Sequence, residues 1–516
     1  MASVKRFACY LFLCLFGLNA SAQLTATDVT NVVARAVKRA RVVSSNSVIA
    51  VVDREGWVLA VWSVNGASPS LDVVANAISK AGTAAFLSSK QNAFSSRSAG
   101  FIIQQHFPPP VNNKPPGPLV GVEFSNLPFS DINKFKAPGS TITFGSSPGN
   151  SIVPVPGTSL AGVPGGLPLY KSNVLVGAIG VASAPAAFAT NKDGSVRCGY
   201  PILPNLYAPY PDEDVALAGQ FGFAPRQEIW GSHVFIDGIR VPYVNSGTRV
   251  VPGVPALTNG AAVAPYSIMG APAAFPYPIV TLGGVTSELR QPIIDDPVAG
   301  TIAGQPRLTA AEVTNIIARA AARAVRTRAG IRLPRGASAA VFITVVNNPD
   351  NPTQAPTVLG TFRTPDATIF SWDVAIQKAR TVIYYSTRPN IFAQPIAFST
   401  RAVGFLAQSL YPPGIIRTAS GPFYCDQEGF SGLIPSATPE PSLPNGITIF
   451  PGGFPLYRNG VLIGAIGVSG DGIDQDDLIA ADGDSLFPAP TDLRADHFTY
   501  RGARLPYAKF PRNPAL

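Results

Sequence analysis

Two stretches of the chain carry a histidine and an arginine at the same spacing, and they are the residues best suited to chemistry. HVFIDGIRVPY spans residues 233–243 and HFTYRGARLPY spans residues 497–507, in a chain with only 3 histidines. The Asp-Gly pair of the first stretch suits a two-residue hairpin turn. Because side chains alternate between the two faces of a strand, this hairpin predicts an apolar face toward the core, with His233 and Arg240 on the other face.

The pairing of an imidazole with a guanidinium indicates a ligand that carries a negative group. The second stretch places His497 and Arg504 as the first places His233 and Arg240. The guanidinium can bind an anionic group and the imidazole can ligate a metal, so His233 and His497 are candidate metal ligands. The nearby positive charge disfavours protonation of the imidazole, which suits metal binding. The alternative is a polar hairpin face that docks on a neighbouring element or on the other repeat.

The third histidine, His106, has no counterpart in the second half of the chain. It ends an apolar segment in FIIQQHFPPP, where the matching FLAQSLYPPG has Leu410. It is either a further ligand or a partly buried histidine whose hydrogen bonds are satisfied. No HExxH, CxxC or P-loop pattern occurs, and no GxGxxG follows a clear strand. The sequence therefore assigns no catalytic residue.

The matching stretches belong to an internal repeat, which is the main organisational feature of the chain. LTATDVTNVVARAVKRA (24–40) matches LTAAEVTNIIARAAARA (308–324). PGGLPLYKSNVLVGAIGV (164–181) matches PGGFPLYRNGVLIGAIGV (451–468). Residues 246–306, between the copies, are rich in Pro, Gly, Val and Ala, which predicts a linker or an extended insertion.

Each copy divides into alternating helices and hairpins. Thr25 with Asp28, and Thr309 with Glu312, form the capping-box pattern that begins a helix. Two β-rich runs about a short turn follow, and then a second helix. That second helix is expected at about 71–88 and, in the other copy, at about 370–386. The order helix, hairpin, helix, hairpin, helix, hairpin predicts an α+β fold of two repeated domains, each an antiparallel sheet flanked by helices.

Several of these motifs resemble the GlcG/HbpS-like family of haem-binding domains, also called haem-degrading domains. The resemblance lies in IAVVDREGWVLAVW, in ISKAGTAAF and above all in the two PGG blocks. It covers most of both repeats and places the two domains at 23–245 and 307–516. It implies small α+β domains, homo-oligomers and binding of haem or another tetrapyrrole. On this basis haem is the expected cofactor, and the candidate residues that bind it are His233, Arg240, His497, Arg504 and His106.

The resemblance leaves three functions open. We expect an exported protein that binds haem and sequesters or senses it. The first alternative is an enzyme that degrades haem oxidatively, with the tetrapyrrole supplying the redox chemistry. The second is a non-catalytic structural or interaction module of the same fold. In the second copy the hairpin reads VVNNPDNPTQAPTVLG instead of VVDREGWVLA, so ligand binding is expected to differ between the halves or to be lost in one of them.

The N-terminus predicts export. A basic MASVKR, an apolar FACYLFLCLFGL and the small residues Ala20-Ser21-Ala22 make residues 1–22 a signal peptide, and the mature chain is expected to be secreted or periplasmic. No later run reaches the roughly 18 apolar residues of a membrane span. Cys198 and Cys425 remain after cleavage and either form one disulfide or are unrelated. The net charge of +9 does not indicate nucleic acid, because no Lys/Arg run with interleaved aromatics is present.

Overall fold

The computed structural model describes residues 22–516 apart from 105, 110, 112–113, 115, 123–129, 131–159, 187, 191–195, 202–204, 248–252, 332–335, 390 and 427–439. For residues 188–190 and 196–201 only the backbone is described. The predicted signal peptide, except for Ala22, lies outside the described residues.

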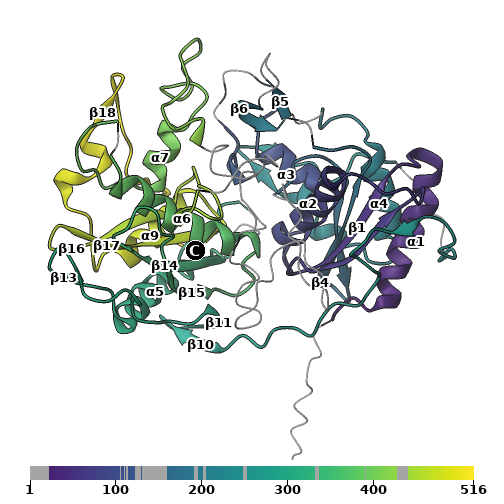
Figure 1. Cartoon of the computed structure of the whole chain (residues 1–516), viewed down its shortest axis with the longest axis horizontal. Coiled ribbons are helices and arrows are strands. Elements are labelled where there is room, and N and C mark those ends of the chain that lie inside the picture. Colours follow the sequence, from purple (N-terminus) through teal and green to yellow (C-terminus); the bar gives the residue numbers. More distant parts are fainter. Residues whose placement is uncertain are drawn as a thin grey trace, which may run out of the picture.

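The first unit is an antiparallel sheet with helices packed against it (Figure 1). Its strands lie in the order β3-β4-β1-β2-β9, and all four pairings are antiparallel. Two short strand pairs, β5-β6 and β7-β8, lie outside this sheet. The elements are α1 (Ala26–Val43), β1 (Val48–Asp53), β2 (Val58–Ser63), α2 (Leu71–Leu87), α3 (Ser96–Ile102), β3 (Gly166–Lys171), β4 (Val174–Ala182), β5 (Phe188–Thr190), β6 (Val196–Pro201), α4 (Pro211–Gln220), β7 (Phe235–Ile236), β8 (Ile239–Arg240) and β9 (Ala261–Ala262).

The second unit repeats this arrangement. Its sheet has the order β10-β11-β15-β14-β17-β16, so β14 to β17 stand where β1 to β4 stand in the first unit. Separate two-stranded pairs are β12-β13 and β18-β19. The elements are β10 (Ile279–Leu282), β11 (Val285–Gln291), β12 (Thr301–Ile302), β13 (Gln305–Pro306), α5 (Ala310–Ala324), β14 (Val341–Asn347), β15 (Val358–Arg363), α6 (Phe370–Thr387), α7 (Thr400–Leu406), β16 (Gly453–Arg458), β17 (Val461–Gly470), α9 (Asp474–Asp484), β18 (Thr499–Tyr500) and β19 (Ala503–Arg504).

Alternate residues of the central strand β1 face two different layers of helices. Val48, Ala50 and Val52 pack in the apolar cluster that includes α2. Ile49 and Val51 pack in the cluster that includes α1 and α4. Because both faces of the sheet are buried, the strand is a continuous apolar run and does not alternate with polar residues.

Glycines in the long strand of each unit let a helix backbone lie directly on the sheet. A Cβ placed on Gly180 would lie 2.1 Å from the carbonyl oxygen of Ala77 in α2. A Cβ on Gly467 would lie 1.9 Å from the carbonyl oxygen of Ala375 in α6. The repeated GAIGV motif therefore marks a close contact between helix and sheet in each unit.

The structure confirms the predicted α+β fold with two repeated domains. Both capping boxes form, with Thr25 bonded to Asp28 and Thr309 bonded to Glu312. The second helices, expected at about 71–88 and 370–386, run from Leu71 to Leu87 and from Phe370 to Thr387. The short helices α3 and α7 were not predicted. Each has seven residues, which is too few for a clear helical periodicity.

The segment between the copies takes part in both sheets. Residues 246–306 were predicted as a linker or an insertion. Within them β9 pairs with β2 of the first unit, whereas β10 and β11 extend the second sheet through β15. The same stretch of chain therefore supplies an edge to each unit.

Two further expectations are only partly covered by the described residues. Cys425 is disulfide-bonded. Its pairing with Cys198 stays a prediction, because the side chain of Cys198 lies outside the described residues. Among the described helices, none combines the length and the apolar character that crossing a bilayer requires.

A buried arginine of β11 joins the connecting segment to both units. The guanidinium of Arg290 binds Glu55 of the first unit at 2.9 Å and Glu288 of its own strand at 2.6 Å. It lies 4.0 Å from the ring centre of Tyr277 and 5.2 Å from that of Trp372 in α6. Burial opposes ionisation of Glu288, but Arg363 and Arg290 outweigh it and hold the pKa of Glu288 below its usual value. We call this contact between the units the seam. Each charged group in it is stabilised in its ionised form by its oppositely charged neighbours.

Replacing Arg290 is expected to weaken the seam strongly. Arg290→Met removes the cation that binds the buried Glu55 and one of the two that bind Glu288, so the free energy of unfolding should fall by about 3–5 kcal/mol. Urea denaturation of the full chain measures this. Because the pKa of Glu288 is lowered in the fold, its contribution should be present at neutral pH and lost as the pH falls below about 4. Arg326→Met, at an exposed arginine of the same protein, is the control and should stay within about 0.5 kcal/mol of wild type. An equal, small effect for both variants would contradict a structural role for Arg290.

Candidate functional site

The hairpin that carries the first histidine forms with the predicted register. Phe235 pairs with Arg240 and Ile236 pairs with Ile239 across β7 and β8. Ile236 is buried, whereas Arg240 is exposed. His233 is also exposed, but it ends a short 3-10 turn before the strand, where its backbone N–H donates to the carbonyl oxygen of Trp230 at 2.9 Å.

The second hairpin has the same form. Thr499 pairs with Arg504 and Tyr500 pairs with Ala503 across β18 and β19. His497 ends the equivalent 3-10 turn, and both His497 and Arg504 are exposed. The outward position predicted for the histidine and the arginine of each copy is therefore correct.

The structure does not bring the imidazole and the guanidinium of a hairpin into contact. Among the described residues no hydrogen bond joins His233 to Arg240 or His497 to Arg504. The guanidinium of Arg240 instead lies 5.1 Å from the ring centre of Phe235, and that of Arg504 lies 3.9 Å from a carboxylate oxygen of Asp496. The part of the chain that the structure describes also contains no cluster of three or more residues suited to bind a metal ion. Each hairpin therefore presents one imidazole and one guanidinium to the solvent, and the two groups are not bonded to each other.

His106 lies apart from these hairpins in the chain and has a hydrogen bond of its own. Its side chain is half-buried, and Nδ1 lies 2.9 Å from the carbonyl oxygen of Lys114. A second ring nitrogen would be available to a ligand. The geometry therefore matches the alternative of a partly buried, hydrogen-bonded histidine without testing its role as a ligand.

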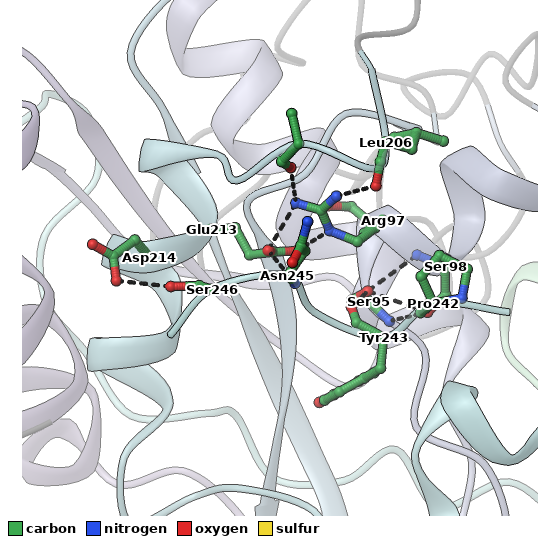
Figure 2. Close-up of polar contacts among 12 residues, drawn as sticks. Ser95, Arg97, Ser98, Leu206, Glu213, Asp214, Pro242, Tyr243, Asn245 and Ser246 are labelled. Carbon is green, nitrogen blue, oxygen red and sulfur yellow. Dashed lines mark hydrogen bonds and ion pairs between the residues drawn. The ribbon is translucent and has the colours of Figure 1, made fainter. Parts of the chain in front are cut away.

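A buried ion pair positions the chain that leaves the first hairpin (Figure 2). Arg97 of α3 binds Glu213 of α4 through two parallel bonds of 2.7 and 2.9 Å, and both side chains are fully buried. The second oxygen of Glu213 also accepts the backbone N–H of Asn245 at 2.8 Å. Next to Arg97, the hydroxyls of Ser95 and Ser98 donate to the carbonyl oxygens of Tyr243 and Pro242. The hairpin is therefore held at its C-terminal end by charge-assisted bonds deep in the unit.

The second unit holds its hairpin in the same way. Arg401 of α7 binds Asp477 and Asp474 of α9. Asp477 also accepts the backbone N–H of Lys509 at 3.1 Å, and the hydroxyl of Ser399 donates to the carbonyl oxygen of Tyr507 at 2.6 Å. The acidic residues that begin this helix suit its N-terminus, and they also anchor the arginine.

A second buried pair lies below the Gly-Gly turn of each unit. Lys80 of α2 binds Asp212 at 2.8 Å and the carbonyl oxygen of Val181 at 2.9 Å. Lys378 binds Asp476 at 2.9 Å in the same position of the second unit. Burial lowers the pKa of Lys80, although Asp212 opposes this shift. The lysines thus act as structural anchors, and the signal that could have revealed their partners is the matched acidic residue at the start of α4 and α9.

The Gly-Gly turn is shaped by this lysine–aspartate pair. Gly165 has φ +131°, and a Cβ there would lie 2.7 Å from the carbonyl oxygen of Val181. Gly452 has φ +112°, and a Cβ there would lie 2.4 Å from the carbonyl oxygen of Val468. A side chain at either position would be strained and would displace the buried pair. In both units the PGG motif therefore forms the turn that covers a buried lysine–aspartate ion pair.

A family model described as haem-degrading protein HbpS-like matches residues 24–188 and 309–484. The two ranges together cover about two thirds of the chain. The chain belongs to the HbpS-like family. Each of its two units contains one HbpS-like match. Both matched ranges include the PGG turn and the second helix, α2 or α6, and the second range also includes the acidic start of α9.

Several solved structures are similar to about one unit's length of this chain. A PduOC–haem complex is 22% identical with a TM-score of 0.24, covering 36% of this chain and 99% of that chain. The Klebsiella pneumoniae protein ORFY is 21% identical with a TM-score of 0.24, covering 37% of this chain and 99% of that chain. A double mutant of Streptomyces reticuli HbpS is 22% identical with a TM-score of 0.21, covering 37% of this chain and 96% of that chain. No curated relative matches the chain.

One of the buried differences between the two HbpS-like units lies beside the last hairpin. In the first unit, Gln220 donates to the hydroxyl of Tyr243 at 3.1 Å and to the carbonyl oxygen of Pro168 at 2.6 Å. In the second unit Asp484 stands there, and its Oδ1 and the hydroxyl of Tyr507 are both buried without a hydrogen-bond partner. Burial raises the pKa of Asp484 well above its usual value, although Arg494 opposes this shift. The native protein therefore prefers this carboxyl protonated.

Replacing Asp484 by asparagine should stabilise the protein at neutral pH. A raised pKa means that the folded chain binds a proton that the unfolded chain releases above about pH 4, so this group costs stability as the pH rises. Asp484→Asn removes that cost and should gain about 1–3 kcal/mol at pH 7, with little change at pH 4. Thermal unfolding at both pH values measures the difference. The reciprocal variant Gln220→Glu should introduce the same loss at pH 7 into the first unit, and a gain independent of pH in Asp484→Asn would refute the explanation.

Proposed function

We propose that the chain is an exported protein that binds haem and sequesters or senses it. The observation that supports this function is the match of both units to a family described by haem degradation. Residues 1–22 carry the pattern of a signal peptide, so the proposed location is secreted or periplasmic.

The exposed donors of the first hairpin are chemically suited to haem. Histidine is a common axial ligand of haem iron, and a guanidinium forms strong bonds with carboxylates such as the haem propionates. His233 and Arg240 supply these two groups from one hairpin. Phe235 beside them is 52% exposed and offers an apolar ring to a porphyrin face. Bound haem would supply redox chemistry, while these residues would bind and orient it.

The second hairpin is the weaker candidate of the two. It retains His497 and Arg504, but Thr499 stands where the first hairpin has Phe235. Arg504 is also engaged by Asp496, so binding a propionate there would require that contact to be released. We therefore propose unequal affinities, with the first unit binding haem more tightly.

Haemin titration of the purified full chain tests the proposal. The Soret band should shift and saturate at one or two haemins per chain. His233→Ala should weaken the tighter phase about tenfold or more, because the iron would lose its axial ligand. His497→Ala should affect only a weaker phase. His106→Ala tests the remaining candidate ligand, whose Nδ1 bonds to the carbonyl oxygen of Lys114 and leaves the second ring nitrogen for the iron; an unchanged titration would remove it from the site.

Two results would contradict these assignments. If His233→Ala and His497→Ala together leave the affinity and the spectrum unchanged, the hairpins do not bind the iron. If no Soret shift occurs at micromolar haemin, the chain keeps the fold without the ligand and acts as a structural or interaction module.

The family description favours one other function, oxidative haem degradation. The same titrated sample distinguishes the two. Adding a reductant in the presence of oxygen should leave the Soret band in place if the protein only stores or senses haem. Progressive loss of the band, absent from a haemin sample without protein, would favour the enzyme.

A further inference from the structure

The two units contact each other through different edges. The first unit contributes Arg54, in the turn between β1 and β2, and residues 88–90, which follow α2. The second unit contributes residues 363–366, at the end of β15, and Ile369, at the start of α6. We call the first set, with its counterparts in the other unit, the docking edge, and the second set, with its counterparts, the receiving edge. Because α2 and α6 are equivalent helices, the end of one meets the start of the other.

A contact between unlike edges does not close on itself. Head-to-tail contacts of this kind generate rings or filaments when they are repeated. Within one chain, the contact uses the docking edge of the first unit and the receiving edge of the second. The docking edge of the second unit and the receiving edge of the first are therefore the positions where a further copy of the chain would add.

A loop of the second unit covers its own docking edge. Ten residues, 348–357, connect β14 to β15, whereas four residues, 54–57, connect β1 to β2. The longer loop lies against the end of α6, where Ile383 beside it is only 4% exposed. Residues 351–354 of the loop face the solvent. The additional residues therefore form a cover over this end of the helix.

The loop occupies the position on the second unit that the second unit occupies on the first. Asn348 and Arg388 line the cavity of about 110 Å³ between the loop and α6. Their counterparts in the first unit, Arg54 and Lys90, line the cavity between the two units. The backbone N–H of Lys90 donates to Asp366 of the second unit at 3.0 Å. The same edge is therefore covered in both units, once by the other unit and once by the loop.

Two arginines of the second unit hold the loop on this edge. The guanidinium of Arg388 donates to the carbonyl oxygen of Pro352 in the loop and to Glu440 at 3.1 Å. Arg380 of α6 donates to the carbonyl oxygen of Pro356, near the end of the loop, at 3.2 Å. Hydrogen bonds from a charged donor are stronger than bonds between neutral groups. The loop is therefore fixed at two points to the helix end that it covers.

The receiving edge of the first unit is more open than that of the second. Leu71 is the counterpart of Ile369, because each stands nine residues before the buried lysine of its helix. Ile369 lies at the seam and is 4% exposed, whereas Leu71 is 66% exposed. Residues 65–68, which precede Leu71, are also exposed. The first unit thus presents an apolar side chain at the edge that would meet the docking edge of a second copy.

We propose that the loop 348–357 is an intramolecular cap that ends head-to-tail association at one chain. It occupies the docking edge on which the receiving edge of a second copy, with its exposed Leu71, would otherwise bind. Terminal units of repeat proteins need such a cover, because an edge built to contact the next unit is otherwise open to association. The cap does not involve the terminal hairpins, so its action does not depend on haem.

Sedimentation of the full chain without haemin, over a range of concentrations, tests the cap. Replacing residues 348–357 by Arg-Glu-Gly-Trp, the shorter turn of the first unit, opens the edge. The average mass should then rise toward that of two or more chains as the concentration increases. Arg388→Ala should have the same effect and should raise the hydrogen-exchange rate of the loop amides about tenfold or more. Arg512→Ala, at an exposed arginine of the same unit, is the control and should change neither quantity.

A second substitution identifies the partner surface. Leu71→Asp places a charge on the exposed receiving edge of the first unit, and an acidic residue suits the N-terminus of α2. It should therefore abolish the association of both opened variants without altering the fold. Opened variants that do not associate, association that survives Leu71→Asp, or unchanged exchange in Arg388→Ala would each overturn the proposal. Association of the wild-type chain that Leu71→Asp abolishes would overturn it as well, because the cap would not be closing the edge.

Discussion

The requirement that a buried charge be paired organises each unit of this protein. Lys80 cannot be ionised in the core without Asp212, and Arg97 cannot be without Glu213. These pairs fix α2 and α3 to the start of α4, and the Gly-Gly turn must pass over one of them with no side chain. Their equivalents recur in the second unit. The pairs make the fold specific, because any other packing would leave a charge in the core without a partner.

Much of the fold was predictable because local patterns and the repeat agreed with each other. The capping boxes fix where α1 and α5 begin, and the Asn459-Gly460 pair adopts the two left-handed φ values, 49° and 81°, that its hairpin turn requires. The edge strands of the segment between the copies were not predictable. Strands such as β9 have two residues, and their pairing depends on a neighbouring sheet that forms only in three dimensions.

The candidate site was predicted in part. Strand alternation correctly placed Arg240 and Arg504 outward, because that inference needs only the turn position. It could not show that His233 and His497 precede the strands in a 3-10 turn, since the turn depends on backbone bonds to Trp230 and Arg494. The pocket between the two units, whose lining includes Arg54 and Asp366, could not be predicted from the sequence. Its charged residues are separated by as many as 312 positions, and no spacing rule relates Arg54 to Asp366.

The covalent link between the two units has a consequence for how they can diverge. In a dimer of identical chains one substitution alters both sites at once, whereas here Phe235 and Thr499, or Gln220 and Asp484, can change independently. The units nevertheless remain at a fixed high local concentration, because they are parts of one polypeptide. A tandem chain can thus keep one site under strict constraint while the other drifts in affinity. Two unequal sites spread ligand occupancy over a wider range of concentrations than two equal ones.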